Sequence, residues 1–346
     1  MQELIKPKHL SAGDTIATVS PSHGLAGDAN VRWKYDLAKK RLEDLFGLSV
    51  ITAPNSMRGS EFLEKNPQAR AEDLIWAFEN KNVKAIIANT GGNDSIKLLS
   101  FINTEIIRNN PKIFIGYSDT MNIHLLCYKV GLSTFYGHNL LYTIGEANAF
   151  HSYSEKWFRK TLFDPSLIGI IEPSSDWTFE CRDHENENRN ASYKRNYYPN
   201  LGYELIQGSG IVTGRLIGGH TEIMELENEK IALSSEDFEN AILFIEDIPE
   251  FFSPKQVGNF FIWLGIKDFL HKLNGVIIGK ICESGGSSEH SNAIRKVCGE
   301  FGRSDLPVLY GLNFGHTSPM FALPYGAIAE INCEMKSFAI LEAGVI

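Results

Sequence analysis

The alternation of short apolar runs with helical stretches in the first 140 residues most constrains the fold. Five runs have the length and composition of buried strands: TIATVS (15–20), LSVITA (48–53), KAIIAN (84–89), KIFIG (112–116) and STFYG (133–137). Between them lie helical patterns at residues 31–46, after Asn66-Pro67, and at 94–108. We expect Asn66 to cap the second of these helices and Pro67 to be its first residue. Short strands alternating with helices indicate βαβ units and a parallel sheet. We therefore predict an α/β protein with a parallel sheet in its N-terminal domain.

The C-terminal part has a different pattern, richer in strands. Strand-like runs are GIVTGRLIGG (210–219), AILFIED (241–247), GVIIGK (275–280) and PVLYGL (307–312), and the last residues alternate as a hairpin does. Ser253-Pro254 is a helix start, with serine as the cap and proline at the first helical position. We predict a smaller, β-rich α+β domain over residues 210–346, following a parallel-sheet domain over residues 1–171.

Residues 172–209 form a polar and charged segment between these two domains. It also contains the aromatic residues Trp177, Phe179, Tyr193, Tyr197 and Tyr198. One interpretation is a solvated connector. The other is a loop that covers substrate, in which aromatic side chains offer stacking surfaces. The pattern of the segment leaves both open.

The bulk composition excludes several classes of protein. The 346 residues are 43% hydrophobic and 22% charged, and the formal net charge is −9, which argues against a nucleic-acid polymer as partner. No apolar run approaches a membrane span, and the first residues lack the apolar core of a secretory signal. The five cysteines are scattered without a CxxC pair, as expected for a cytoplasmic protein with reduced thiols. We expect no metal and no cofactor, because no HExxH or paired ligand motif occurs.

Ser118 lies where the apolar run 112–116 gives way to a helical pattern. A strand that turns tightly into a helix presents a side chain at the carboxyl edge of a sheet, where open α/β sheets bind ligands. The stretch GYSDT resembles the nucleophile elbow G-x-S-x-G, with Thr120 in place of the second glycine. The alternative is that Ser118 only caps the helix.

A serine nucleophile requires a base, and the base requires a group that orients it. Glu246 ends an apolar strand, where an orienting carboxylate would lie, and His316 follows Gly315 in a loop rich in proline and glycine. Each is also compatible with a purely structural role. Gly91-Gly92 follow the strand 84–89, and glycine there would let backbone N–H groups approach an oxyanion.

Four motifs together, TGGND, GYSD, FIED and GHTSPMFALPYG, resemble the LD-carboxypeptidase family over roughly residues 5–345. These are serine peptidases with a Ser-Glu-His triad, and they include the microcin C self-immunity peptidases. The resemblance implies that Ser118 is the nucleophile, His316 the base and Glu246 its orienting acid. It also implies a Rossmann-like N-terminal domain and a smaller β-rich C-terminal domain, with the site between them. It further implies an oxyanion hole from the amides of Gly92 and Asp119, and a homodimer.

Two departures from the family pattern bear on the substrate. Asn89-Thr90 precede the glycine pair where the family often has arginine, and Gly218-Gly219-His220 stands where it often has Gly-Gly-Asn. We therefore expect Gly91, Trp177 and His220 to contact substrate. The long segment 172–209 favours the microcin-immunity branch, whose loop aromatics stack on a nucleotide.

The expected substrate is thus a small peptide or an aminoacyl-nucleotide conjugate, cleaved at an amide bond through an acyl-enzyme. Three alternatives remain. The first is a murein tetrapeptide LD-carboxypeptidase of peptidoglycan recycling. The second is an esterase of the α/β-hydrolase kind, which shares the order Ser, acid, His but has a glycine-rich oxyanion loop that this chain lacks. The third is a binding protein without catalysis.

Overall fold

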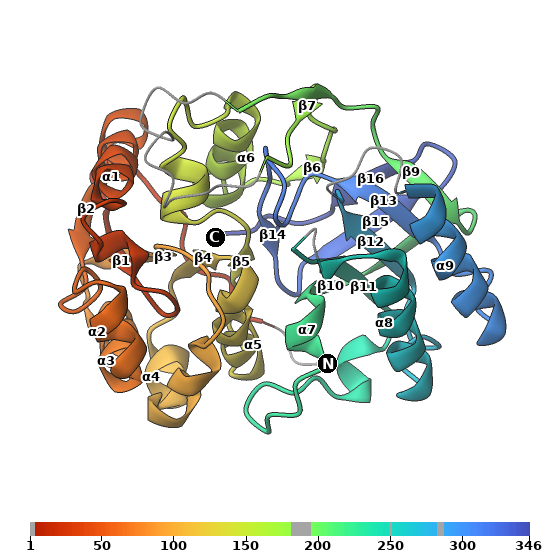
Figure 1. The fold of residues 1–346 in the computed structure, drawn as a ribbon, viewed down its shortest axis with the longest axis horizontal. Helices are drawn as coiled ribbons and strands as arrows, with labels where there is room; N and C mark the ends of the chain where they lie inside the picture. The colour runs from red at the N-terminus through yellow and green to blue at the C-terminus, as the bar shows by residue number, and fades with distance from the viewer. Residues whose placement is uncertain (1–3, 181–194, 249–250, 282–286) are drawn as a thin grey trace.

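Two β-sheets lie side by side in the computed structural model, one in the N-terminal part and one in the C-terminal part (Figure 1). The structure describes residues 4–180, 195–248, 251–281 and 287–346. The arrangement confirms the predicted fold class: a parallel Rossmann-like sheet followed by a second region rich in strands.

The first sheet has six strands in the order β14-β5-β4-β3-β1-β2. Its strands are β1 (Thr15–Val19), β2 (Ser49–Thr52), β3 (Val83–Ala88), β4 (Ile113–Gly116), β5 (Phe135–Tyr136) and β14 (Leu323–Pro324). All neighbouring pairs run parallel except β5 and β14. Because parallel strands share one carboxyl edge, the loops after β1, β3 and β4 meet there.

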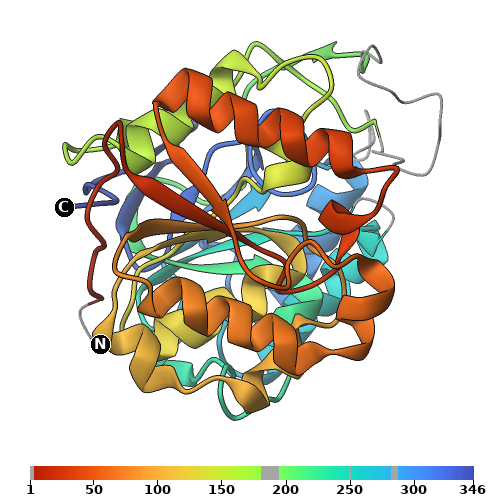
Figure 2. The same ribbon diagram turned by 90° about the vertical axis from the view of Figure 1, so that its left-hand side faces the viewer.

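Helices cover both faces of this sheet, with α1 on one side and α3 on the other (Figure 2). The helices of this part are α1 (Arg32–Phe46), α2 (Ser60–Lys65), α3 (Pro67–Glu79), α4 (Thr104–Asn109), α5 (Met121–Lys129) and α6 (Ser152–Leu162). Alternate residues of β3 lie on opposite faces of the sheet. Ala85 and Ile87 pack in one hydrophobic core with α1, and Ile86 packs in the other with α3. The apolar run therefore reflects burial on both faces.

Two local predictions in this part are wrong. Asn66 makes no capping hydrogen bond to the start of α3, and its amide donates to the Phe62 carbonyl at 2.8 Å. Residues 94–108 do not form one helix; a 3₁₀ helix, Ser95–Phe101, is followed by α4. The chain restarts there because the Asn103 side chain accepts the Glu105 N–H at 3.1 Å and caps α4.

The second sheet has eight strands in the order β6-β16-β15-β10-β11-β12-β13-β9. Its strands are β6 (Gly169–Ile170), β9 (Glu204–Gln207), β10 (Ile211–His220), β11 (Ala241–Glu246), β12 (Gly275–Gly279), β13 (Val308–Leu312), β15 (Ile328–Asn332) and β16 (Ser337–Ile340). The four central strands run parallel, and β15 and β16 form the predicted hairpin. The helices are α7 (Thr221–Met224), α8 (Pro254–Ile266) and α9 (Ser287–Glu300), and Ser253 caps α8 as predicted.

Three short strands cross the ranges that the sequence suggested for the domains. β6 lies within 1–171 but joins the second sheet, and β14 lies within 210–346 but joins the first. Within 172–209, β9 is an edge strand of the second sheet, so the end of this segment is not a connector. Earlier in the segment, β7 (Asp176–Trp177) pairs with β8 (Tyr198–Pro199), whereas residues 181–194, including Tyr193, lie outside the described residues.

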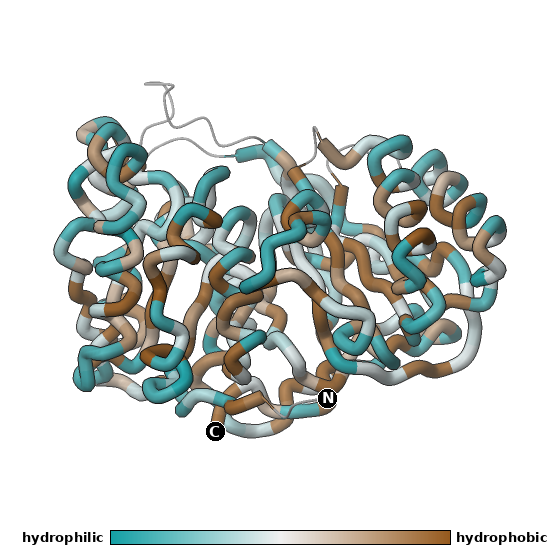
Figure 3. The backbone as a smooth tube through the Cα atoms, turned by 90° about the horizontal axis from the view of Figure 1, so that it is seen from below, coloured by the Kyte–Doolittle hydropathy of each residue, from teal (hydrophilic) through white to brown (hydrophobic). Residues whose placement is uncertain are grey.

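Hydropathy follows this layered arrangement: hydrophobic residues concentrate in the strands, and hydrophilic ones are frequent on the outer helices (Figure 3). Among the described residues, no helix combines the length and the apolar character needed to cross a bilayer.

Candidate active site

Ser118 lies on a sharp turn between β4 and α5. Its φ is 63°, a left-handed conformation that a residue with a side chain adopts only under constraint. Two glycines make room for the turn. A Cβ on Gly116 would lie 2.7 Å from the Thr120 hydroxyl, and one on Gly91 would lie 2.9 Å from the Ser118 Cβ. The geometry is that of a nucleophile elbow, and the strain holds the serine at the sheet edge.

Three of the candidate residues form one hydrogen-bonded chain. The Ser118 Oγ lies 3.0 Å from the His316 Nε2, and the His316 Nδ1 lies 2.6 Å from the Glu246 Oε2. Because the carboxylate accepts the Nδ1–H, the Nε2 of neutral His316 is free to accept the proton of the serine. The serine follows β4 of the first sheet, Glu246 ends β11 of the second, and His316 lies in the loop between β13 of the second sheet and β14 of the first. The site therefore lies where the sheets meet.

Glu246 is a buried carboxylate at the end of β11, only 2% exposed. Burial alone would raise the pKa of Glu246, but the charge and hydrogen bonding of His316, with His220 and Tyr136, outweigh burial and lower it. Gly315 keeps the histidine loop close, because a Cβ there would lie 2.5 Å from the Glu246 Oε2. Glu246 is therefore held ionised, which the predicted role of an orienting acid requires.

Tyr136 is a component that the sequence reasoning missed. Its hydroxyl donates to the Glu246 Oε1 and accepts the Ser118 backbone N–H at 3.1 Å. One buried phenol thus connects the serine turn to the acid across the two sheets. A signal was present in the sequence, because a tyrosine in a fully buried strand requires a partner for its hydroxyl. The identity of that partner depends on tertiary structure.

Gly91 and Gly92 lie beside the serine, where the sequence placed them. A Cβ on Gly92, whose φ is 155°, would overlap the Ser22 Oγ, and only glycine allows this close approach. The Asp119 side chain is buried, and its carboxylate accepts hydrogen bonds from Ser22, Asp94 and Ser95. The oxyanion roles of the Gly92 and Asp119 amides stay predictions.

A cavity of about 460 Å³ opens directly onto Ser118 and His316. Described residues from several loops line it: His23, Thr90, Gly91, Gly92, Asn93, Tyr117, Asn139, Tyr142, Phe179, Glu180, Ile248 and Phe251. Four of these are aromatic, and this described lining contains no lysine or arginine. The cavity is therefore suited to a small ligand with flat or apolar surface next to the bond that reacts.

Two of the predicted substrate contacts do not line this cavity. Trp177 is buried, with the Lys280 ammonium 5.0 Å from its ring centroid, and its neighbour Phe179 lines the cavity instead. His220 is also buried; its ring lies 5.7 Å from the His316 ring, and its Nε2 lies 3.2 Å from the Asp247 Oδ1. Gly91, the third predicted contact, does line the cavity. Within the described ranges, no group of three or more His, Cys, Asp or Glu side chains is arranged to hold a metal ion.

An elbow serine hydrogen-bonded to a histidine and through it to a buried acid, at the edge of a parallel sheet, defines a serine hydrolase. The chain belongs to the LD-carboxypeptidase family of serine carboxypeptidases. The family's N-terminal domain matches residues 16–137 and its C-terminal domain matches residues 213–331. The family resemblance expected from the sequence is confirmed.

Relatives of two kinds are about equally similar to the chain. The microcin C7 self-immunity protein MccF of Escherichia coli is 29% identical, covering 96% of this chain and 94% of its own. A probable murein peptide carboxypeptidase of Bacillus subtilis is also 29% identical, covering 98% and 95%. Among solved structures, an MccF-like protein from Streptococcus pneumoniae in complex with AMP superposes with a TM-score of 0.84, at 29% identity over 95% and 98% of the two chains.

Proposed function

We propose that this protein is a serine carboxypeptidase in which Ser118 attacks, His316 transfers the proton and Glu246 orients the histidine. The observation that carries the proposal is the hydrogen-bonded chain from the Ser118 Oγ through His316 to the Glu246 carboxylate, open to a cavity at its serine end. If Ser118 only capped the helix, it would need neither the His316 Nε2 at 3.0 Å from its hydroxyl nor a strained φ.

The reaction follows from this geometry in two halves. The Ser118 Oγ attacks the acyl carbon while its proton passes to the His316 Nε2. The tetrahedral intermediate then collapses, and the histidine donates that proton to the departing nitrogen, which leaves an acyl-enzyme and a free amine. Water enters, His316 removes its proton, and collapse of the second intermediate releases the acid and restores the serine. The Gly92 and Asp119 amides are the proposed donors to each oxyanion.

The proposed substrate is a small aminoacyl-nucleotide conjugate. Tyr117, Tyr142, Phe179 and Phe251 offer aromatic surface beside the serine, and stacking on a base is worth roughly 1–3 kcal/mol. MccF has been solved in complex with aspartyl sulfamoyl adenosine, and that structure superposes with a TM-score of 0.83 at 25% identity. The described lining has no lysine or arginine, which favours recognition of the nucleoside over recognition of a phosphate.

The second candidate is a murein tetrapeptide as substrate. The murein peptide carboxypeptidase relative is as similar to this chain as MccF is. The Glu180 side of the cavity would also attract a free amino group, as a peptide carries. The two substrates share the catalytic residues and differ in what fills the rest of the cavity.

The test is a direct competition between the two substrates. Purified protein receives a murein tetrapeptide and an aminoacyl-sulfamoyl adenosine in one mixture, and mass spectrometry follows both products, with Ser118→Ala as the blank. Faster release of sulfamoyl adenosine supports the first proposal. Faster loss of the terminal residue of the tetrapeptide selects the second, and turnover of neither by wild-type protein rejects both. The predicted homodimer also stays a proposal, which sedimentation at enzyme-assay concentrations tests.

A further inference from the structure

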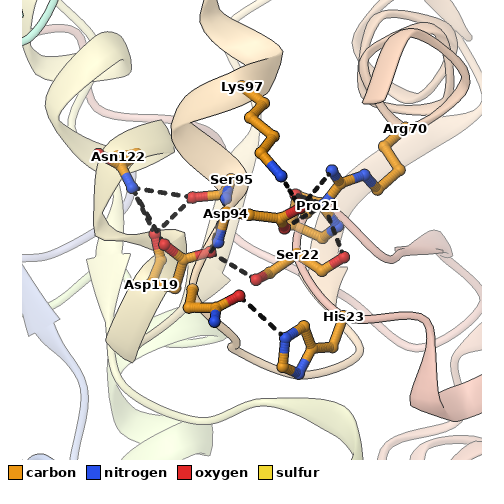
Figure 4. A network of polar contacts seen from close by, with 10 residues as sticks. Pro21, Ser22, His23, Arg70, Asp94, Ser95, Lys97, Asp119 and Asn122 are labelled. Carbon is orange, nitrogen blue, oxygen red and sulfur yellow. Dashed lines mark hydrogen bonds and ion pairs between the residues drawn. The ribbon is translucent and has the colours of Figure 1, made fainter. Parts of the chain in front are cut away.

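The side chain of Asp119, the residue after the serine, is the centre of a buried hydrogen-bond network (Figure 4). Its Oδ2 accepts three hydrogen bonds, from the Ser22 hydroxyl at 2.5 Å, the Asp94 N–H at 3.1 Å and the Ser95 N–H at 2.8 Å. Its Oδ1 accepts the Asn122 amide at 3.2 Å. The side chain therefore has a function besides that predicted for its backbone amide.

These contacts join three loops at the carboxyl edge of the first sheet. Ser22 follows β1, Asp94 and Ser95 follow β3, and Asp119 is in the turn that follows β4. Arg70 of α3 strengthens the same connection, because it pairs with Asp94 at 2.6 and 3.0 Å and donates to the Ser22 carbonyl at 2.8 Å. The Arg70 side chain is only 1% exposed, so water weakens this pair little.

The connected loops also carry the glycine pair that lies against the serine. The His23 N–H donates to the Gly91 carbonyl at 3.2 Å, and a Cβ on Gly92 would overlap the Ser22 Oγ. On the side that faces Ser118, Gly91 has room only for a hydrogen atom, because a Cβ there would lie 2.9 Å from the Ser118 Cβ. The backbone of the glycine pair is thus confined between Ser22 and Ser118. Ser22 is hydrogen-bonded to the Asp119 carboxylate, and Ser118 precedes Asp119 in the chain.

We propose that the Asp119 carboxylate is a positioning residue that fixes the Gly91–Gly92 backbone relative to Ser118, and so sets the geometry of the oxyanion hole. This inference rests on the proposed function, which places the oxyanion between the Gly92 and Asp119 amides. A carboxylate suits the role because one anionic oxygen accepts three donors at once, which a neutral amide does less well. A shift of about 1 Å in such a site costs on the order of 10²-fold in rate.

The experiment compares Asp119→Ala, Asp119→Asn and Ser22→Ala with wild type in steady-state hydrolysis and in labelling of Ser118 by a fluorophosphonate. The probe forms a bond from the Ser118 Oγ to phosphorus as fluoride leaves, and its phosphoryl oxygen takes the oxyanion position. Lys97→Ala is the matched control, because Lys97 contacts the same network through Asp94 at 3.2 Å but is 55% exposed. Thermal unfolding verifies that each variant is folded.

We expect Asp119→Ala to lower kcat and the labelling rate together, by about 10²-fold, with KM within about threefold of wild type. Asp119→Asn retains an acceptor and should fall between Asp119→Ala and wild type. Ser22→Ala should lower kcat and the labelling rate less than either Asp119 variant, and Lys97→Ala should leave both unchanged. If Asp119→Ala does not fold, the same order among the other three variants carries the test.

Two results would overturn the inference while leaving the proposed function intact. One is an Asp119→Asn variant with wild-type kcat and labelling rate. The other is a rise in KM with unchanged kcat, which would mean that the network shapes the pocket and not the oxyanion hole. Failure of wild-type protein to react with the probe at Ser118 would overturn both proposals.

Discussion

Removing the Tyr136 hydroxyl should weaken both the fold and the reaction. Tyr136→Phe deletes the donor to the Glu246 carboxylate and leaves the Ser118 N–H without its acceptor. A hydrogen bond to a charged group contributes about 1.5–3 kcal/mol, and a buried unpaired N–H costs about 1–3 kcal/mol. The free energy of unfolding should therefore fall by about 2.5–6 kcal/mol.

The length of the chain determines how far this loss of stability lowers the melting temperature. With an unfolding entropy of about 2.1 cal/mol/K per residue, 346 residues give about 0.7 kcal/mol/K. The Tm should then fall by about 4–9 °C. In hydrolysis, the same hydroxyl holds the acid and the serine turn in one geometry, so we expect kcat to fall about 10- to 100-fold, at about 1.4 kcal/mol per factor of ten.

Tyr325→Phe is the matched control. Tyr325 is a fully buried tyrosine whose ring lies 6.4 Å from that of Tyr136, but its hydroxyl donates to the Gly218 carbonyl. It should lower the Tm and leave kcat within about threefold of wild type. The assay is initial-rate hydrolysis of whichever substrate wild-type protein turns over, with calorimetry at the same pH. Equal rates for wild type and Tyr136→Phe, or equal rate losses in the two tyrosine variants, would refute the reasoning.

Three further outcomes follow from the site. Ser118→Ala and His316→Ala should each lower kcat by about 10⁴- to 10⁶-fold without loss of folding, and a variant retaining a tenth of the wild-type rate would remove the mechanism. Phe179→Ala should raise KM for an aminoacyl-nucleotide about 5- to 150-fold and exceed the effect of Trp177→Ala, because Phe179 lines the cavity; the reverse order would restore Trp177 as the stacking residue. Burial raises the pKa of Asp247 to about 7 from an ordinary 3.8, so the stability it contributes is present below about pH 4 and is lost as pH rises through 7. The Tm of wild type should therefore fall relative to the Tm of Asp247→Asn between pH 4 and 8. If the two proteins show parallel plots of Tm against pH, Asp247 is not the cause of the loss.

The sequence was sufficient where a local pattern has a physical cause. The apolar runs of the first sheet are continuous because both faces of strands such as β3 are buried, so the periodicity identified the strands and the βαβ order. The serine turn was visible because a glycine, a single serine and a helix start occur in six residues. His316 and Glu246 were found from their motifs, and the structure brings both within hydrogen-bonding distance of their partners.

Other features were invisible because they depend on contacts between distant segments. Tyr136 is 110 residues from Glu246, and no pattern in either strand indicates that they meet. The Asp119 network joins loops up to 97 residues apart. β9 was hidden in a polar segment because it is an edge strand that pairs on one side only, with β13. An edge strand does not need the continuous apolar run that marks a central strand.

The position of His316 relative to the serine depends on β14, one of two strands of only two residues in the first sheet. The chain leaving His316 reaches β14 within seven residues, and there Leu323 pairs with Tyr136 of β5. Tyr136 in turn holds the Ser118 N–H and the Glu246 carboxylate, and Glu246 holds the histidine. The loop carrying His316 is therefore fixed at one end through β14, and the histidine side chain itself is held by Glu246. Two residues are too few to form a sequence pattern, yet their pairing anchors to the first sheet the segment that leaves β13 of the second, next to the site of the proposed proton transfer.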